Sequence, residues 1–119
     1  MLREEVFELA KRSKSYLPAT RDALTVLGIQ IAIARRELGW SAAELAERLG
    51  VSRPLISRLE NGHPSTQIGT VFEAAALCGV PLFGADRSDL RRLVDTERAR
   101  LALLPERVRP VRVELDDDF

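Results

Sequence analysis

The feature that most constrains the fold is a pair of short helical patterns joined at a glycine, SAAELAERLGVSRPLISRLENG, which begins at Ser41. Glu44 lies three residues after Ser41, which is the capping-box pattern that starts a helix. Gly50 follows the first apolar run, and glycine ends a helix at little cost because it accepts a positive φ. Ser52 can cap a second helix, with Pro54 in the first turn, where a missing N–H is harmless. The stretch predicts a helix-turn-helix; the alternative is an ordinary helical hairpin in a small bundle.

Apolar residues elsewhere in the chain recur at spacings of three and four, which predicts further helices. Aromatic residues make up only 5% of the chain while alanine, leucine and arginine abound, and this composition favours helix over sheet. Only VRVEL alternates apolar and charged residues as a strand does. We predict an all-α fold with one short strand. The predicted helices lie near residues 2–14, 20–38, 41–49, 52–60, 65–78 and 86–104, and the strand lies at 111–115.

The charge of the chain limits what a nucleic-acid interface could be. The 119 residues carry 18 Lys and Arg against 18 Asp and Glu, so the formal net charge is zero. Basic charge supplies most of the non-specific affinity for nucleic acid, and this chain has no excess of it. Residues 1–64 carry 10 basic and 8 acidic side chains, and residues 65–119 carry 8 and 10. The basic side chains near the helix-turn-helix are therefore the ones to consider.

Several classes of protein are excluded by what the sequence contains. No apolar run approaches the roughly 18–20 residues of a membrane span, and Glu4, Glu5 and Glu8 interrupt the N-terminal apolar spacing of a secretory signal. Cys78 is the single cysteine and His63 the single histidine, so neither an internal disulfide nor a structural zinc site is expected. With no nucleophile–base arrangement and no Gly-rich phosphate loop, we expect a cytoplasmic protein that is not an enzyme and needs no cofactor.

The segment from Leu24 to Gly79, which includes LGIQIAIARRELGWSAAELAERLGVSRPLISRLENG, resembles the Xre/lambda-repressor-like family of DNA-binding domains. The resemblance implies a five-helix bundle whose third helix enters the major groove, usually as a dimer. It implies that the groove-facing residues are Ser52, Arg53, Pro54, Ser57 and Arg58, and that Asn61 and His63 touch backbone phosphate. The chain would then divide into an N-terminal helical extension (1–19), a DNA-binding domain (20–84) and a C-terminal helix, strand and tail (85–119).

One position departs from the family pattern. The residue after the Ser41 cap is commonly a glutamine that bonds phosphate and braces the recognition helix, but here it is Ala42. We therefore expect phosphate anchoring from Ser41, Arg35 or Arg36 instead. An exposed arginine at a helix N-terminus, such as Arg53, can fork onto the O6 and N7 atoms of guanine.

Each basic residue also has an alternative interpretation. Arg53 can be a solvated surface residue, and Arg58 can pair with Glu60 or Glu47 on the same surface. His63, in NGHPS, can be a turn residue rather than a phosphate contact.

The flanking segments GTVFEAAALCGVPLFGAD, RLALLPERVRP and DDDF resemble those of HipB-like antitoxins, which pair with HipA-type kinase toxins. That resemblance implies a protein that represses its own operon and holds a toxin inactive. Alternatives are a stand-alone Xre-family regulator and a protein-binding adapter on a helix-turn-helix scaffold.

We also expect a homodimer, because pairing doubles the few base contacts of one helix-turn-helix on a palindromic site of double-stranded DNA. The acidic tail can bind a basic partner surface or be a solvated end. The residues predicted for the dimer or partner surface are Leu90, Val94, Leu101, Leu104, Val111, Val113, Leu115, Asp116, Asp117, Asp118 and Phe119.

Overall fold

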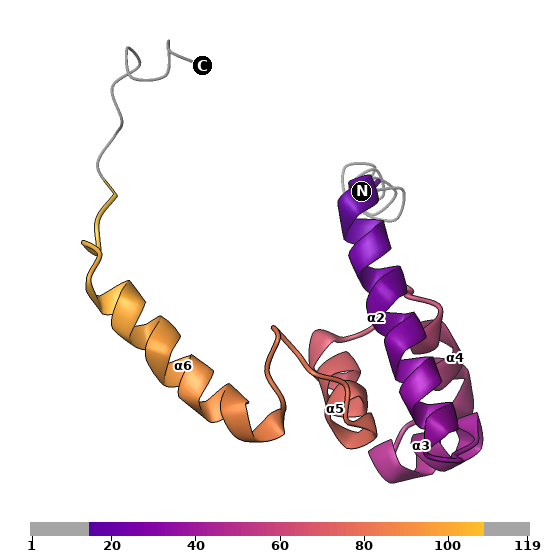
Figure 1. Ribbon diagram of the computed structural model, residues 1–119. Coiled ribbons are helices and arrows are strands. Elements are labelled where there is room, and N and C mark those ends of the chain that lie inside the picture. The colour runs from indigo at the N-terminus through magenta and orange to yellow at the C-terminus, as the bar shows by residue number, and fades with distance from the viewer. Residues whose placement is uncertain (1–14, 109–119) are drawn as a thin grey trace.

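The computed structural model describes residues 15–108, and five helices lie within that range (Figure 1). They are α2 (Pro18–Glu37), α3 (Ala42–Leu49), α4 (Arg53–Glu60), α5 (Ile68–Cys78) and α6 (Arg87–Ala102). The predicted all-α class is confirmed for this part of the chain, where the β structure is limited to an isolated bridge between Leu82 and Ala85. The predicted N-terminal helix at 2–14 and the predicted strand at 111–115 lie outside the described residues.

The helix boundaries follow local capping signals, with two corrections to the sequence-based expectation. Helix α2 begins at Pro18 after Leu17, not after Thr20, because a proline suits the first helical position, where no N–H bond is needed. Helix α5 begins after Gln67, not after Ser65 or Thr66, and its first turn receives no side-chain cap.

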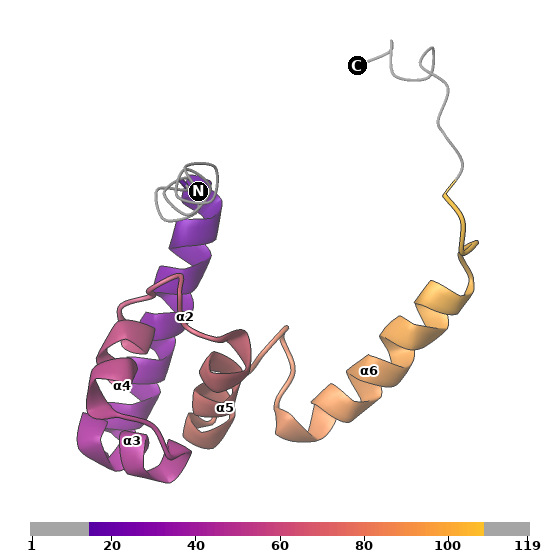
Figure 2. The same cartoon turned by 180° about the vertical axis from the view of Figure 1, so that it is seen from behind.

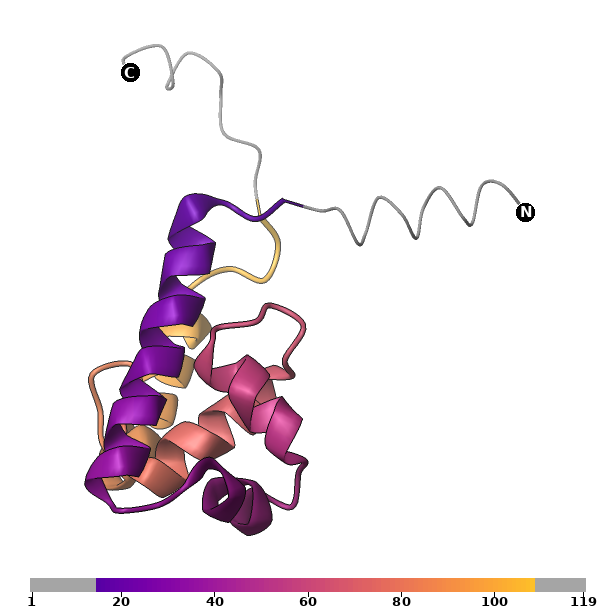
Figure 3. The ribbon, with the colours of Figure 1, turned by 90° about the vertical axis from the view of Figure 1, so that its right-hand side faces the viewer.

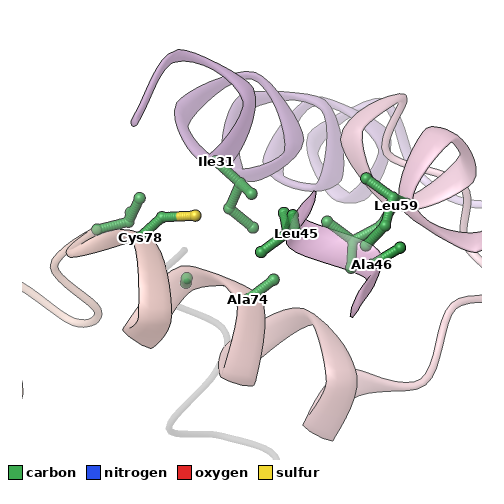
Figure 4. Packing of buried hydrophobic residues seen from close by; sticks show 9 residues of the cluster. Ile31, Leu45, Ala46, Leu59, Ala74 and Cys78 are labelled. Carbon is green, nitrogen blue, oxygen red and sulfur yellow. The ribbon is translucent and has the colours of Figure 1, made fainter. Parts of the chain in front are cut away.

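Four helices, α2 to α5, enclose the hydrophobic core (Figure 4). Ile31 from α2, Leu45 from α3 and Ile56 from α4 are fully buried. Ala74 and Ala75 from α5 are buried too, and their small side chains let that helix approach closely. The remaining buried members of this cluster are Ala46, Leu59, Cys78 and Val80.

Helix α2 crosses α4 at a glycine that the sequence-based reasoning did not single out. A Cβ atom added at Gly28 would lie 2.5 Å from the carbonyl oxygen of Glu60, and Gly28 is buried. Contacts closer than about 3 Å are not compatible with a side chain there. The end of α4 is therefore held against α2 by direct backbone packing.

Helix α6 stands apart from the other four in both the front and the rear views (Figures 1 and 2). It begins at Asp86, whose carboxylate accepts a hydrogen bond from the backbone N–H of Asp89 at 3.0 Å, as predicted. None of its residues is buried, and none belongs to the core cluster. Of the helices in residues 15–108, four therefore form the packed unit, and α6, which we expected as a separate C-terminal helix, lies outside it.

The side view shows the long α2 running along the packed unit, with α3 at one end of it (Figure 3). Within residues 15–108, no helix combines the length and the apolar character that crossing a membrane requires.

Candidate nucleic-acid interface

The turn between α3 and α4 sets the direction in which α4, the second helix of the motif, leaves α3. Gly50 ends α3 in the left-handed conformation at φ 72°, which a side chain would disfavour. Ser52 then caps α4, because its Oγ accepts a hydrogen bond from the backbone N–H of Leu55 at 3.3 Å. Pro54 occupies the first turn. The predicted helix-turn-helix and its capping residues are confirmed.

One face of α4 is fully open to solvent while the other is in the core. Ile56 and Leu59 are buried, and Leu55 is half-buried. The exposed side chains recur at a spacing of four, as one helix face requires. They are Arg53, Pro54, Ser57 and Arg58, preceded by the equally exposed cap Ser52.

Three basic side chains that we predicted to contact DNA are free to do so in the described structure. Among the described residues, Arg53 and Arg58 on α4 and Arg36 at the end of α2 form no ion pair. All three are exposed. The alternative in which Arg58 pairs with Glu60 does not occur, since Glu60 is bound to Arg35.

Arg35 does not belong to this surface, which corrects one predicted phosphate anchor. Its Nε donates to Oε2 of Glu60 at 2.6 Å, and one terminal nitrogen donates to Oε1 at 3.0 Å. The other terminal nitrogen donates to the carbonyl oxygen of Trp40 at 2.9 Å. The hydrogen bond to Glu60 raises the pKa of Arg35 above its usual value, against the opposing effect of burial. Arg35 lies one turn beyond the buried Ile31, and this places it in the interior.

Ser41 is exposed at the start of α3 and forms the predicted capping box. Its Oγ accepts from the backbone N–H of Glu44 at 3.0 Å, and its own N–H donates to the Glu44 carboxylate at 2.9 Å. That bond from the Ser41 N–H holds the pKa of Glu44 below its usual value. The hydroxyl proton of Ser41 is the group that can still donate to a phosphate.

Two predicted phosphate contacts follow α4. Asn61 is its C-terminal cap and is exposed. His63 is also exposed, and its Nδ1 accepts from the backbone N–H of Ser65 at 3.2 Å, with the Ser65 hydroxyl 2.8 Å away. His63 is thus a turn residue, as the alternative interpretation has it, and its Nε2 takes no part in these contacts.

Sequence reasoning missed a polar hollow of about 330 Å³ beside α4. The Oγ1 atom of Thr66 in its wall is buried without a hydrogen-bond partner in the described structure. Gln67 and Thr70, at the uncapped start of α5, also line it. The residues lining the hollow are Leu55, Arg58, Ser65, Thr66, Gln67 and Thr70. The only sequence signal is the polar run Ser65-Thr66-Gln67, in which Ser65 or Thr66 indicates no more than the start of a helix.

Trp40 and Cys78 have structural roles. The half-buried Trp40 packs against the core, and the guanidinium carbon of Arg48 lies 4.1 Å from its ring centroid, a cation–π contact. Burial raises the pKa of the Cys78 thiol, which is the environment of an unreactive cysteine. Among residues 15–108, no three His, Cys, Asp or Glu side chains gather in a way that could hold a metal ion.

The predicted dimer or partner residues fall into two groups. Leu90 is half-buried on α6, whereas Val94, Leu101 and Leu104 are exposed by 37%, 69% and 66%. The others lie outside the described residues and are Val111, Val113, Leu115, Asp116, Asp117, Asp118 and Phe119.

Comparison with known families identifies residues 31–84 as a match to the family model described as Helix-turn-helix. The matched range includes α3, α4 and α5 and therefore the open face of α4. The match supports the Xre-like family and a DNA-binding transcriptional regulator. Neither the curated proteins nor the solved structures compared with this chain gave a match.

Proposed function

We propose that this chain is a sequence-specific DNA-binding repressor that inserts α4 into the major groove. The observation that carries the proposal is the pair of exposed, unpaired arginines on the open face of α4, within the matched helix-turn-helix. A major groove about 12 Å wide admits one α-helix. The core residues Ile56 and Leu59 anchor the opposite face, so α4 can enter the groove without uncovering the core.

Within this proposal Arg53 reads a base. It lies in the first turn of α4, and the N-terminal residues of a recognition helix are the ones that approach base edges. A guanidinium can donate two hydrogen bonds to guanine O6 and N7, which no other base pair accepts in the same way. Pro54 and Ser57 would lie beside it against the groove.

The phosphate contacts would flank the helix on both sides. Arg36 lies before the motif and Ser41 at its start, and Arg58, Asn61 and His63 lie at its end. The polar hollow beside Arg58 adds the unsatisfied N–H groups of the first turn of α5, which can donate to a phosphate oxygen.

The net charge of zero affects how this repressor would bind DNA. Non-specific attraction to DNA is weak without excess basic charge, so recognition depends on few well-placed contacts. A homodimer on a two-fold operator doubles those contacts, and we include it in the proposal. Residues 20–84 would be the DNA-binding part, residues 1–19 an N-terminal extension, and residues 85–119 the part that pairs with a second chain.

As the finer form of the proposal, the chain would be the antitoxin and autorepressor of a HipBA-like toxin–antitoxin operon. The support is the resemblance of its flanking segments to HipB-like antitoxins and the apolar side chains exposed on α6. A HipA-like kinase would then be its protein partner. A stand-alone Xre-family regulator and a protein-binding adapter remain the competing functions. Inhibition of a kinase encoded beside this gene separates the antitoxin from the first of these.

A selection from random duplex DNA tests the repressor itself. The full chain should enrich one palindromic sequence, and its affinity for that sequence should fall with rising salt concentration because phosphate contacts release counterions. Replacing both Arg53 and Arg58 with alanine should abolish enrichment, whereas Arg87→Ala, which is exposed at the start of α6, should not. A wild-type chain that enriches no sequence at low salt would leave the adapter function as the better description.

A further inference from the structure

Helix α6 and the turn that follows it carry an apolar face that the rest of the described chain leaves partly open. Its members recur at helical spacings and are Leu90, Leu93, Val94, Leu101 and Leu104. Val94, Leu101 and Leu104 are exposed, while Leu90 and Leu93 are half-buried, and no residue of α6 is buried. We refer to these five residues as the α6 face. Glu97 is the one charged residue in the middle of it, because it lies three or four residues from both Val94 and Leu101.

The two halves of the α6 face differ in the size of the hollow that each one lines. The first half forms a groove of about 640 Å³, lined by Phe83, Leu90, Leu93, Val94, Glu97 and Arg98. The second half is a smaller hollow of about 350 Å³, lined by Glu97, Arg100, Leu101, Leu103 and Leu104. Glu97 belongs to both, so the groove and the hollow follow each other along the helix.

Phe83, in the wall of the groove, has a strained backbone conformation. Phe83 is in the left-handed region at φ 55°, a conformation that is unfavourable for a bulky residue. Its ring packs edge-on against Phe72 of α5, with the centroids 5.9 Å apart and the planes at 75°. Phe83 is nevertheless 75% exposed. The backbone therefore holds an aromatic ring at the edge of the groove, where the described residues leave most of it uncovered.

Charges around Glu97 suit a second copy in the antiparallel direction. Glu97 binds Arg100 of its own helix at 3.0 Å, whereas Arg98, which also lines the groove, has no ion pair among the described residues. A two-fold axis near the middle of α6 would bring each Arg98 close to the Glu97 of the other copy. The same axis would set the leucines at the end of one helix over the groove at the start of the other.

We infer that α6 is a dimerisation arm whose apolar face pairs, antiparallel, with the α6 face of a second copy of this chain. Leu101 of the second copy lies on Val94, and its Leu104 enters the groove beside Phe83 and Leu90. The contact is isologous, so both grooves are filled at once. This inference rests on the homodimer of the proposed function and assigns its interface, but it does not depend on DNA binding.

A parallel pair fits the chain less well. It would place the two grooves against each other and leave Leu101 and Leu104 of one copy facing the same residues of the other. It would also bring the two Glu97 carboxylates together. Like charges in direct contact oppose association. The antiparallel direction is thus the one that joins unlike surfaces.

Sedimentation of the full chain at micromolar concentration tests the interface. The wild type should sediment at twice its chain mass of 13.3 kDa. Val94→Glu and Leu101→Glu should each raise the dimer Kd by about tenfold or more, because each buries an unpaired carboxylate in an apolar contact. Ala99→Glu is the matched control, since Ala99 is exposed on the opposite face of the same helix. None of these positions is buried, and unchanged circular dichroism would verify the fold.

Disulfide trapping then tests the direction of the pair. Mixing the variants Val94→Cys and Leu101→Cys should give a cross-linked heterodimer, whereas Val94→Cys alone should not link to itself. In the antiparallel pair two copies of position 94 lie about 10 Å apart along the axis, beyond the roughly 7 Å that a disulfide spans. The native Cys78 can stay, because it is buried.

The outcomes are separable. Dimers of Val94→Glu and Leu101→Glu that are as tight as the wild type overturn the α6 interface and leave the homodimer intact. Self-linking of Val94→Cys overturns the antiparallel direction. A wild type that stays monomeric at micromolar concentration overturns both the inference and the homodimer, while DNA selection still tests the repressor. A monomer that captures another protein through the α6 face overturns it in favour of a partner interface.

Discussion

Arg35 and Glu60 join the long helix α2 to the end of the recognition helix α4 through two hydrogen bonds of 2.6 and 3.0 Å. Both side chains are almost enclosed, with 8% and 12% of their surfaces exposed. The third hydrogen bond of Arg35 reaches the carbonyl oxygen of Trp40, in the turn before α3. One side chain therefore fixes α2, the turn and α4 relative to each other, beside the close approach of Gly28 to the Glu60 backbone.

Breaking this ion pair should destabilise the fold more than any exposed charge change. Arg35→Met and Glu60→Gln should each lower the free energy of unfolding by about 3–5 kcal/mol, because each leaves a buried group without its partner. Urea denaturation measures the change, with Arg36→Met as the control at an exposed neighbouring arginine. An Arg35→Met variant as stable as Arg36→Met would mean that the pair is not structural.

The proposed base contact gives a different signature. Arg53→Ala should weaken binding to the selected site by about 1–3 kcal/mol and relax sequence preference at one base pair, because a bidentate contact is lost. Unfolding should change little, since Arg53 is exposed. Competition binding against single-base variants of the site measures the preference. An unchanged specificity ratio would rule out Arg53 as the reading residue.

Arg36 provides the contrasting case of a proposed phosphate contact. Arg36→Ala should weaken binding to all sequences alike and lower the slope of log K against log salt by about 1. A titration at several salt concentrations, run on both the selected site and a scrambled duplex, measures this. Loss of affinity for the selected site alone would indicate that Arg36 contacts a base or positions one that does.

The capping signals of this fold could be predicted from sequence because they are local. Ser41 with Glu44, Gly50 and Ser52 each act over three or four residues, and all of them act in the structure as predicted. The burial of Arg35 could not be predicted that way. Its partner Glu60 lies 25 residues further on, and the apolar residues Ala34 and Leu38, not Arg35, continue the helical spacing from Ile31.

The position of α6 likewise could not be predicted from local sequence patterns. The spacing of Leu90 and Val94 predicted a helix, and the helix is there. Spacing alone does not tell how far an apolar face is covered by its own chain, and in the described part of this chain no residue of α6 is buried. The polar hollow beside Arg58 was missed for a related reason, since it forms only where α4 and the start of α5 meet.

Two helical glycines form a matched test of the α2–α4 crossing. Gly28→Ala should destabilise the protein, because its Cβ would lie 2.5 Å from the carbonyl oxygen of Glu60 and backbone cannot move aside cheaply. Gly69→Ala, in α5, meets no atom within 4 Å and should stabilise by up to about 1 kcal/mol through helix propensity. Thermal unfolding measures both. Equal effects of the two substitutions would show that the crossing is not close.

The capping box of α3 should make stability depend on pH in one direction. The hydrogen bond from the Ser41 N–H lowers the pKa of Glu44 in the folded state below its ordinary value of 4.5. The unfolded chain therefore holds this proton more tightly than the folded chain, and the charged form favours folding. The contribution is fully present above pH 4.5 and is lost as the pH falls through the lower folded pKa.

Glu44→Gln should thus be less stable than the wild type at neutral pH, and the difference should shrink as the solution is acidified. Thermal unfolding across that range measures it, with Glu47→Gln as the control at an exposed glutamate of the same helix outside the capping box. A difference between Glu44→Gln and the wild type that stays constant from neutral to acidic pH would show that the charge of Glu44 does not stabilise α3.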